Sequence, residues 1–249
     1  IEPELREDRG ELEAAEEGRL PELVEEKRLR GDLHCHTDRT DGRNTIEEMA
    51  AAARARGYDY LAVTDHSKAV SVANGLDDDG MREHAERIRS ADEELDDLWL
   101  LAGVEVDILE KGRLDLSEEV LADLDWVVAS IHYHLNQGRK RITDRLLAAV
   151  ESGVVHALGH PTARMIGSRE PLDFDHDRVF AACAEHGVCL EINCQSKRLD
   201  LPDTLCRRAK EAGAKIAIGT DAHHRGALPT IRQGLTVARR GWLEREETE

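Results

Sequence analysis

The stretch DLHCHTDRTDG, residues 32–42, contains two histidines separated by one residue, His34 and His36, and an aspartate further on, Asp41. Side chains at positions i and i+2 of a β-strand point to the same side, so we expect the two imidazole rings to face one point. Imidazole nitrogens and carboxylate oxygens are ligands of zinc and similar divalent ions. The stretch therefore predicts a metal site, although an H-x-H pair alone is a weak signal.

Histidines and carboxylates recur at the ends of apolar segments along the rest of the chain. The complete set is His34, His36, Asp41, His66, Glu105, His132, His160, Asp221 and His223. If these segments are parallel strands, their carboxyl ends lie on one side of the sheet and the side chains converge. A single His–Asp pair can be a buried hydrogen-bonding pair. The whole set without a metal would bury several charges at a high desolvation cost, so we expect a metal cluster.

The number of donors exceeds what one ion takes, since zinc binds about four ligands and manganese about six. We therefore expect two or three divalent ions (Mn, Zn or Fe), with Glu105, in the middle of the set, as a bridging carboxylate. Clustered divalent ions lower the pKa of bound water to about 7 and hold the oxygens of a phosphoryl group. The set predicts phosphoester hydrolysis by a metal-bound hydroxide held by Glu105. The sequence does not identify the general acid.

Seven apolar segments, each followed by a helical pattern, must position these residues. The expected strands are residues 30–36, 59–66, 99–109, 126–132, 154–161, 188–193 and 215–223. This alternation predicts an α/β fold of parallel strands with right-handed crossovers. A closed barrel and an open doubly wound sheet both fit the pattern. No G-x-G-x-x-G or P-loop follows the first segment, which argues against a nucleotide-binding open sheet.

Composition limits the function further. The chain has 249 residues and a formal net charge of −18, a surface that repels a phosphodiester backbone at long range. We therefore expect only weak, salt-sensitive DNA binding by this segment alone. The five cysteines form no C-x-x-C pair, which indicates a reducing, cytoplasmic setting. No apolar run approaches the ~20 residues of a membrane span, so we expect no membrane partner.

The motifs resemble the PHP (polymerase and histidinol phosphatase) superfamily. The resemblance rests on DLHCHTDRTDG, TDHS, GVEVD, SIH, GHP and TDAH, in that order over residues 30–224. It is closer with the C-terminal PHP domain of bacterial family X DNA polymerases, on the stretches PELREDRGE, GHPTARMIGSREP, EIN…RLDLPD and VARRGWLE. It implies a distorted (β/α)7 barrel with the metal site at the carboxyl ends of the strands. Residues 1–28, a charged leader or linker, resemble the end of a polymerase core, and residues 29–249 form the barrel domain.

The resemblance also divides the ligands among three ions. One ion takes His34, His36, Glu105 and Asp221; a second takes Glu105, His132 and His160; a third takes Asp41, His66 and His223. The implied activity is Mn-dependent 3′–5′ exonuclease or 3′-end processing, including abasic sites, in DNA repair. The implied partners are DNA 3′ ends or a small phosphate ester as substrate, and an attached polymerase domain.

Four further side chains are expected to bind substrate. Arg164, Arg198 and Lys68 lie in loops after the expected strands, where a cation meets a phosphate, and Asn193 ends the one strand without a ligand. Each can also be an ordinary surface or backbone contact. Asp65, next to His66, can orient a ligand histidine or cap the following turn.

Three other functions compete with the exonuclease. An amidohydrolase also begins with H-x-H, but it usually needs a bridging lysine on a middle strand, where this chain has Glu105 and His132. A histidinol-phosphatase-like phosphomonoesterase shares the site chemistry, and only the polymerase-like leader argues against it. A metal-bound structural scaffold for the polymerase is the third, and the complete ligand set argues against that.

Overall fold

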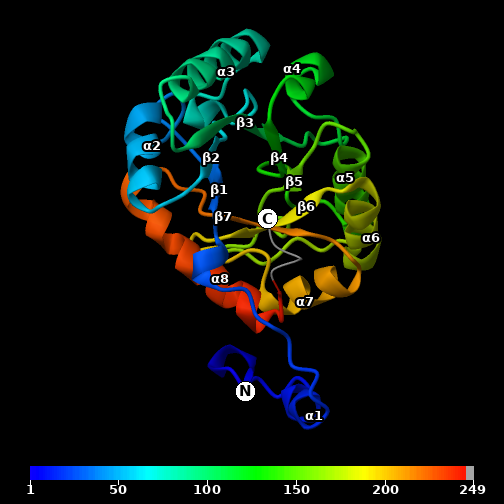
Figure 1. Ribbon diagram of the computed structural model, residues 1–249. Helices are drawn as coiled ribbons and strands as arrows, with labels where there is room; N and C mark the ends of the chain where they lie inside the picture. Colours follow the sequence, from blue (N-terminus) through cyan, green and yellow to red (C-terminus); the bar gives the residue numbers. More distant parts are fainter. Residues whose placement is uncertain (245–249) are drawn as a thin grey trace.

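The computed structural model describes residues 1–244, and the last five positions of the expected barrel domain lie outside the described part. Seven parallel strands form one sheet in the order in which they follow along the chain, as Figure 1 shows. They are β1 Gly31–Cys35, β2 Tyr60–Val63, β3 Trp99–Asp107, β4 Trp126–Ser130, β5 Ala157–Leu158, β6 Cys189–Asn193 and β7 Ile216–Gly219. The expected strands are thus confirmed, although β5 is much shorter than the segment that predicted it.

The sheet curves into a nearly closed barrel. The last strand returns to the first, where the His36 amide donates to the Ala222 carbonyl at 2.9 Å. One apolar residue from each of six strands joins an inner cluster, separate from the main core: Leu33, Ala62, Val128, Ala157, Cys189 and Ala217. Side chains from six different strands can meet only inside the barrel, so this cluster fills its interior. The open sheet that the sequence also allowed is excluded.

Helices surround the strands on the outside (Figure 1). They are α2 Ile46–Ala55, α3 Asp78–Asp92, α4 Glu118–Ala122, α5 Arg139–Val150, α6 His176–His186, α7 Asp203–Glu211 and α8 Ile231–Arg240, with the 3₁₀ turns η3 Ser71–Ala73 and η4 Arg225–Thr230. The sequence sets the ends of α2. A capping box between Thr45 and Glu48 begins it, and Gly57, at φ 74°, follows its end.

The leader contains three short helical pieces and contacts the barrel. These are η1 Pro3–Leu5, α1 Glu11–Glu16 and η2 Glu26–Arg28. Leu5 is buried, and Arg239 on α8 donates to the Glu4 carboxylate at 2.7 Å. Leu23 also forms an antiparallel bridge with Glu244. Residues 1–28 thus pack beside α8. Within residues 1–244, none of the helices has the length and apolar character needed to cross a membrane.

Candidate metal centre

All nine expected ligands meet at the carboxyl ends of the strands. His34, on β1, and His36, directly after it, are fully buried, and Glu105 on β3 is 1% exposed. The Asp41, His132 and His223 side chains retain 33%, 17% and 31% exposure. The cluster therefore has a buried floor, and these three side chains face its open side.

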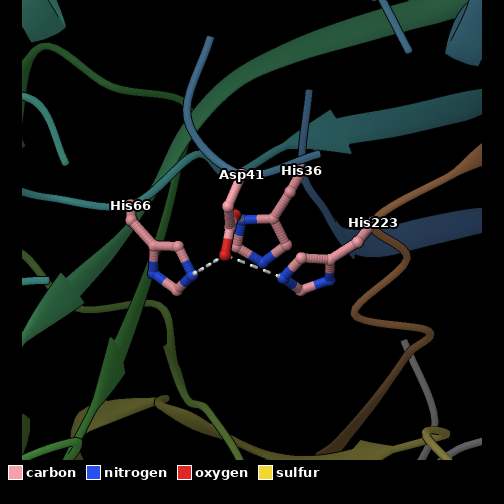
Figure 2. Close-up of side chains that lie close together, drawn as sticks. All are labelled: His36, Asp41, His66 and His223. Atoms are coloured by element: carbon pink, nitrogen blue, oxygen red, sulfur yellow. Dashed lines mark ion pairs between the residues drawn. The ribbon is translucent and has the colours of Figure 1, made fainter. Parts of the chain in front are cut away.

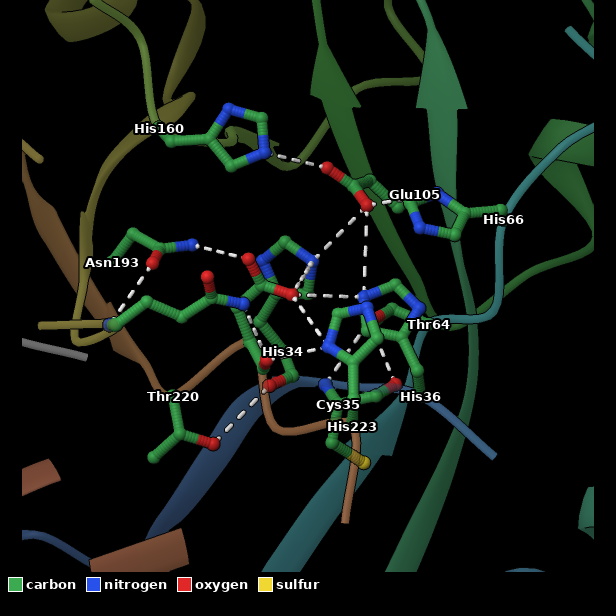
Figure 3. Close-up of polar contacts among 12 residues, drawn as sticks. His34, Cys35, His36, Thr64, His66, Glu105, His160, Asn193, Thr220 and His223 are labelled. Carbon is green, nitrogen blue, oxygen red and sulfur yellow. Dashed lines mark hydrogen bonds and ion pairs between the residues drawn. The ribbon is translucent and has the colours of Figure 1, made fainter. Parts of the chain in front are cut away.

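Glu105 lies between two groups of histidines. Its Oε1 is 2.9 Å from His160 Nε2 and 3.3 Å from His132 Nε2. Its Oε2 is 3.0 Å from His66 Nδ1 and 3.4 Å from His34 Nε2. Figure 3 shows the carboxylate of Glu105 with His160 on one side and His66 on the other. Each oxygen thus faces a different group, which is the geometry of a bridging carboxylate.

A further group of donors forms around Asp41, as Figure 2 shows. Asp41 Oδ2 lies 3.3 Å from His223 Nε2 and 3.6 Å from His66 Nε2. His36 reaches the same group through Nδ1, 3.9 Å from Asp41 Oδ1. Its other nitrogen, Nε2, lies 3.1 Å from Asp221 Oδ1.

Within the described part of the chain, three groups of donors are close enough to hold an ion. They are His36–Asp41–His66–His223, His34–His36–Asp221 and His66–Glu105–His132. The grouping shares His36 and His66 between neighbours, whereas the resemblance gave each to one ion. The assignment of each ligand to an ion stays a prediction.

Unpartnered ring nitrogens test whether this set fits metal ions. His34 Nε2, both nitrogens of His36, and His66 Nδ1 are buried without a hydrogen-bond partner in the described residues. Buried polar atoms are normally satisfied, because an unsatisfied one costs about 1–3 kcal/mol. Several such nitrogens beside ionised carboxylates are the donor set that Zn, Mn or Fe prefers. The residues therefore fit divalent ions.

The electrostatics of the cluster favour a cation. Burial works against the charged ring of His132, but the Glu105 and Asp107 carboxylates raise its pKa to about 10. Burial likewise opposes ionisation of Glu105, yet the surrounding histidines hold its pKa well below the usual range. Burial and the neighbouring His66 lower the pKa of His36 to about 4. Anionic carboxylates and a neutral imidazole are the forms that bind metal.

A carboxylate on β6 holds two of these histidines, and the sequence did not reveal it. Glu191, 2% exposed, lies 2.5 Å from His34 Nδ1 and accepts the His160 amide at 2.6 Å. The His34 ring is thereby fixed with Nε2 toward Glu105. The signal in the sequence is a charged residue inside the apolar segment VCLEIN, two positions from Asn193 and therefore on the same face.

The close approach of β6, β7 and β1 depends on a residue without a side chain. A Cβ on Gly219 would lie 2.7 Å from both Glu191 Oε1 and His34 Cβ. His160 and Asp221 also adopt positive φ, 29° and 52°. Such backbone persists only where the surrounding structure enforces it, and it concentrates at functional sites.

Asp65 supports the loop that carries Asp41. It accepts the Thr37 amide at 2.9 Å and the Thr37 hydroxyl at 2.6 Å, and it also accepts the Thr40 hydroxyl. Buried His84, on α3, lies 2.8 Å from the same carboxylate. Within residues 1–244, the Asp65 carboxylate has no hydrogen bond to a ligand ring or to the turn that follows it. Instead it joins β2, α3 and the loop between β1 and α2.

The four expected substrate residues differ in position. Arg198 has Nε and Nη1 buried without a partner among the described residues, and its charge lowers the pKa of His160, together with the larger effect of burial. Arg164 donates instead to the carbonyls of Arg198 and Leu199, so it anchors the loop that carries Arg198. Lys68 pairs with Asp78 at 3.0 Å. Asn193 is buried and donates to Asp221 at 3.0 Å.

Chelating divalent ions is expected to lower the melting temperature of the chain by about 5–10 °C. A ligand at 100-fold its Kd stabilises the native state by about 2.7 kcal/mol, and each kcal/mol is worth about 2–4 °C at this size. Thermal unfolding followed by circular dichroism, before and after EDTA and after re-addition of Mn²⁺ or Zn²⁺, measures the shift. Equal melting temperatures with and without bound ions would contradict this prediction.

Comparison with known proteins gives three findings. The PHP domain family model matches residues 32–195. DNA polymerase/3'-5' exonuclease PolX of Bacillus subtilis is 39% identical over 244 residues, 98% of this chain but only 42% of that protein. A probable phosphatase of Photobacterium profundum is 34% identical over 202 residues, 77% of each chain.

The fold has a solved counterpart. The histidinol phosphate phosphatase of Lactococcus lactis, complexed with Zn, L-histidinol and phosphate, superposes with a TM-score of 0.59 at 19% identity, covering 86% of this chain and 94% of that one. At this identity the similarity concerns the barrel alone.

Proposed function

The chain belongs to the PHP domain family, and we propose that it processes DNA 3′ ends as a 3′–5′ exonuclease. Its relatives, which include probable phosphatases, support the broader class of metal-dependent phosphoesterase. The observation that carries this proposal is the convergence of six histidines and three carboxylates, with Glu105 between two groups of them. We also propose that residues 1–28 are the end of a polymerase core. The match to the Bacillus subtilis protein includes this leader, because it covers 98% of the chain.

The proposed ligands are the nine converging residues, and they hold two or three ions of Mn, Zn or Fe. Such ions, when bound, supply a water of lowered pKa and neutralise the phosphoryl oxygens. Glu191 keeps the His34 ring oriented, and Asn193 does the same for the Asp221 carboxylate. The most exposed ligands, Asp41 and His223, lie on the side from which substrate arrives.

Arg198 is the proposed phosphate contact outside the ligand set. Its buried Nε and Nη1, unpartnered among the described residues, each leave a hydrogen-bond donor that a phosphoryl oxygen could accept. Arg164 fixes the main chain of the Arg198 loop and so positions that guanidinium. Asn193 donates to the proposed ligand Asp221 and thereby positions that carboxylate. Lys68 forms an exposed ion pair with Asp78, and its contact with the phosphate stays a prediction.

A phosphomonoesterase is the second candidate. Relatives named probable phosphatases favour it. The match spans 77% of this chain and 77% of one such relative, and 83% and 84% for another, so these relatives are of similar length to this chain. Both candidates use the same ligands and differ only in what lies beyond the reacting phosphate.

A substrate panel separates the two candidates. The metal-loaded chain is offered a 5′-labelled oligonucleotide, an abasic duplex, a 3′-phosphate end and histidinol phosphate. We expect stepwise shortening of the oligonucleotide from its 3′ end, and its loss in His34→Ala, because that ring is buried in the floor of the cluster. Hydrolysis of histidinol phosphate alone would establish the phosphatase instead. If the ions are confirmed to be present and no substrate is turned over, the structural scaffold is the remaining candidate function.

A further inference from the structure

A groove leads away from the metal cluster at His132. It encloses about 730 Å³ and is lined by the connection between β4 and α5, by Glu110, and by residues 169–173. A neighbouring hollow of about 420 Å³ shares Glu110, Gln137 and Arg141 with it and continues to Lys111. The two hollows therefore form one path from a proposed ligand across the rim of the barrel. A small phosphate ester bound at the ions has no need of such a path.

The side chains along this path combine an aromatic ring with free cations. Tyr133 directly follows His132 and is 40% exposed. Arg141 and Lys111 are exposed and form no ion pair within residues 1–244. Their neighbours differ, since Arg139 pairs with Asp173 at 3.1 Å and Lys140 pairs with Asp144 at 2.6 Å. Aromatic faces with unpaired cations beside them are the usual elements of a site for single-stranded nucleic acid.

A buried arginine fixes the shape of the loop that carries Tyr133. Arg145, on α5, is 2% exposed, and its Nη1 donates to the carbonyls of Tyr133 and His134 at 3.3 and 3.2 Å. The same nitrogen donates to Gln137 Oε1 at 3.1 Å, and Nη2 donates to the Ile108 carbonyl at 2.5 Å. The loop is thereby tied to the end of β3, so the main chain that carries the Tyr133 ring is fixed before substrate arrives. Such preorganisation reduces the entropy lost on binding.

We propose that this groove binds the unpaired strand upstream of the scissile phosphate, with a base stacked on Tyr133 and phosphates at Arg141 and Lys111. The inference rests on the proposed 3′-end activity and specifies its substrate: an oligonucleotide strand rather than a mononucleotide or a small ester. Stacking on one ring accepts any base, so the groove selects for strand length and not for sequence. Glu110, Glu170 and Asp173 also line the first hollow, and Asp144 lines the second, so the attraction of phosphates is local and is screened by salt.

The test compares long and short substrates on the metal-loaded chain. Single-turnover and steady-state rates are measured on a 3′-labelled oligothymidylate and on p-nitrophenyl phosphate, for wild type, Tyr133→Ala, Tyr133→Phe and Arg141→Ala. In Tyr133→Ala, kcat/KM is expected to fall at least about tenfold more on the oligonucleotide than on the small ester. Tyr133→Phe keeps the ring and should restore the oligonucleotide rate. Arg141→Ala should raise KM for the oligonucleotide at low salt, with the difference vanishing at high salt. Arg87→Ala, an equal charge change at an exposed position of α3 that lines neither hollow, is the matched control.

Direct binding separates this inference from the proposed activity. Fluorescence anisotropy with an oligothymidylate protected by 3′ phosphorothioate linkages should show binding by wild type, weakened about tenfold in Tyr133→Ala. If wild type binds the protected strand through Tyr133 and yet leaves the unprotected oligothymidylate intact, that result would refute the proposed exonuclease and support the proposed groove. The proposed groove would be overturned if wild type did not bind the strand, or if Tyr133→Ala bound it equally well. It would also be overturned if Tyr133→Ala lowered kcat/KM equally on the oligonucleotide and on the small ester.

Discussion

Replacing Glu105 by glutamine is expected to lower phosphoesterase turnover by about 10³-fold or more and to reduce the number of ions that the chain retains. Glu105 is 1% exposed, and its two oxygens face different groups of histidines, His132 and His160 on one side and His34 and His66 on the other. Glutamine preserves the shape of the side chain, but its NH₂ group cannot bind a cation. Divalent ions contribute several kcal/mol of charge stabilisation in the transition state, and each 1.36 kcal/mol is tenfold in rate.

Two measurements distinguish loss of the bridge from loss of the fold. Ions per chain are counted by elemental analysis after dialysis, and folding is followed by circular dichroism. Glu185→Gln, on the exposed side of α6, makes the same chemical change away from the cluster and should change neither. A Glu105→Gln chain with wild-type ion content and turnover would show that Glu105 does not bridge the ions.

The convergence of the nine proposed ligands could be predicted because each of them belongs to a short local pattern. His34 and His36 follow the two-residue repeat of a strand, and Asp221 and His223 end another apolar segment. Parallel strands place all these ends on one side, so the local patterns suffice to predict the convergence. Barrel closure required more than local information, since it depends on the contact between β7 and β1 at Ala222.

The supporting residues escaped prediction because their partners are distant in the sequence. Glu191 contacts His34, 157 positions away, and Arg164 contacts the carbonyl of Arg198, 34 positions away. The partner of Asp65 on α3 is likewise set only by packing of that helix. For the same reason, a basic loop residue such as Lys68 cannot be assigned from sequence to a phosphate or to an aspartate.

The chain offers two levels of selectivity, which follow from different parts of the barrel. The buried floor of the cluster is the proposed site of the ions and the reacting phosphate, which all phosphoesters share. The loops after β3, β4 and β5 form the groove beyond His132, and they are free to vary without disturbing the floor. Relatives named as phosphatases and as an exonuclease can therefore share one cluster.

Replacing Glu191 by alanine is expected to weaken metal affinity by about 10–100-fold, the usual effect of removing a carboxylate that orients a ligand histidine. Glu191 lies 2.5 Å from His34 Nδ1 and accepts the His160 amide at 2.6 Å, so its loss frees both a ligand ring and the backbone of a second ligand. Glu191 also accepts from Asn193 Nδ2 at 3.3 Å, so the effect passes through the two histidines or through Asn193, which holds Asp221. Titration calorimetry with Mn²⁺ or Zn²⁺ measures affinity without reference to turnover.

A double-mutant cycle identifies the route of this effect. If Glu191 acts by holding the His34 ring, the double variant Glu191→Ala/His34→Ala loses less affinity than the sum of the two single variants, because residues that share one contact are not additive. Glu191→Gln retains one acceptor oxygen and should recover part of the affinity. Full additivity would instead assign the effect of Glu191 to the His160 amide or to Asn193, since neither contact depends on the His34 ring. If Glu191→Ala binds Mn²⁺ or Zn²⁺ with wild-type affinity, Glu191 has no role in metal binding.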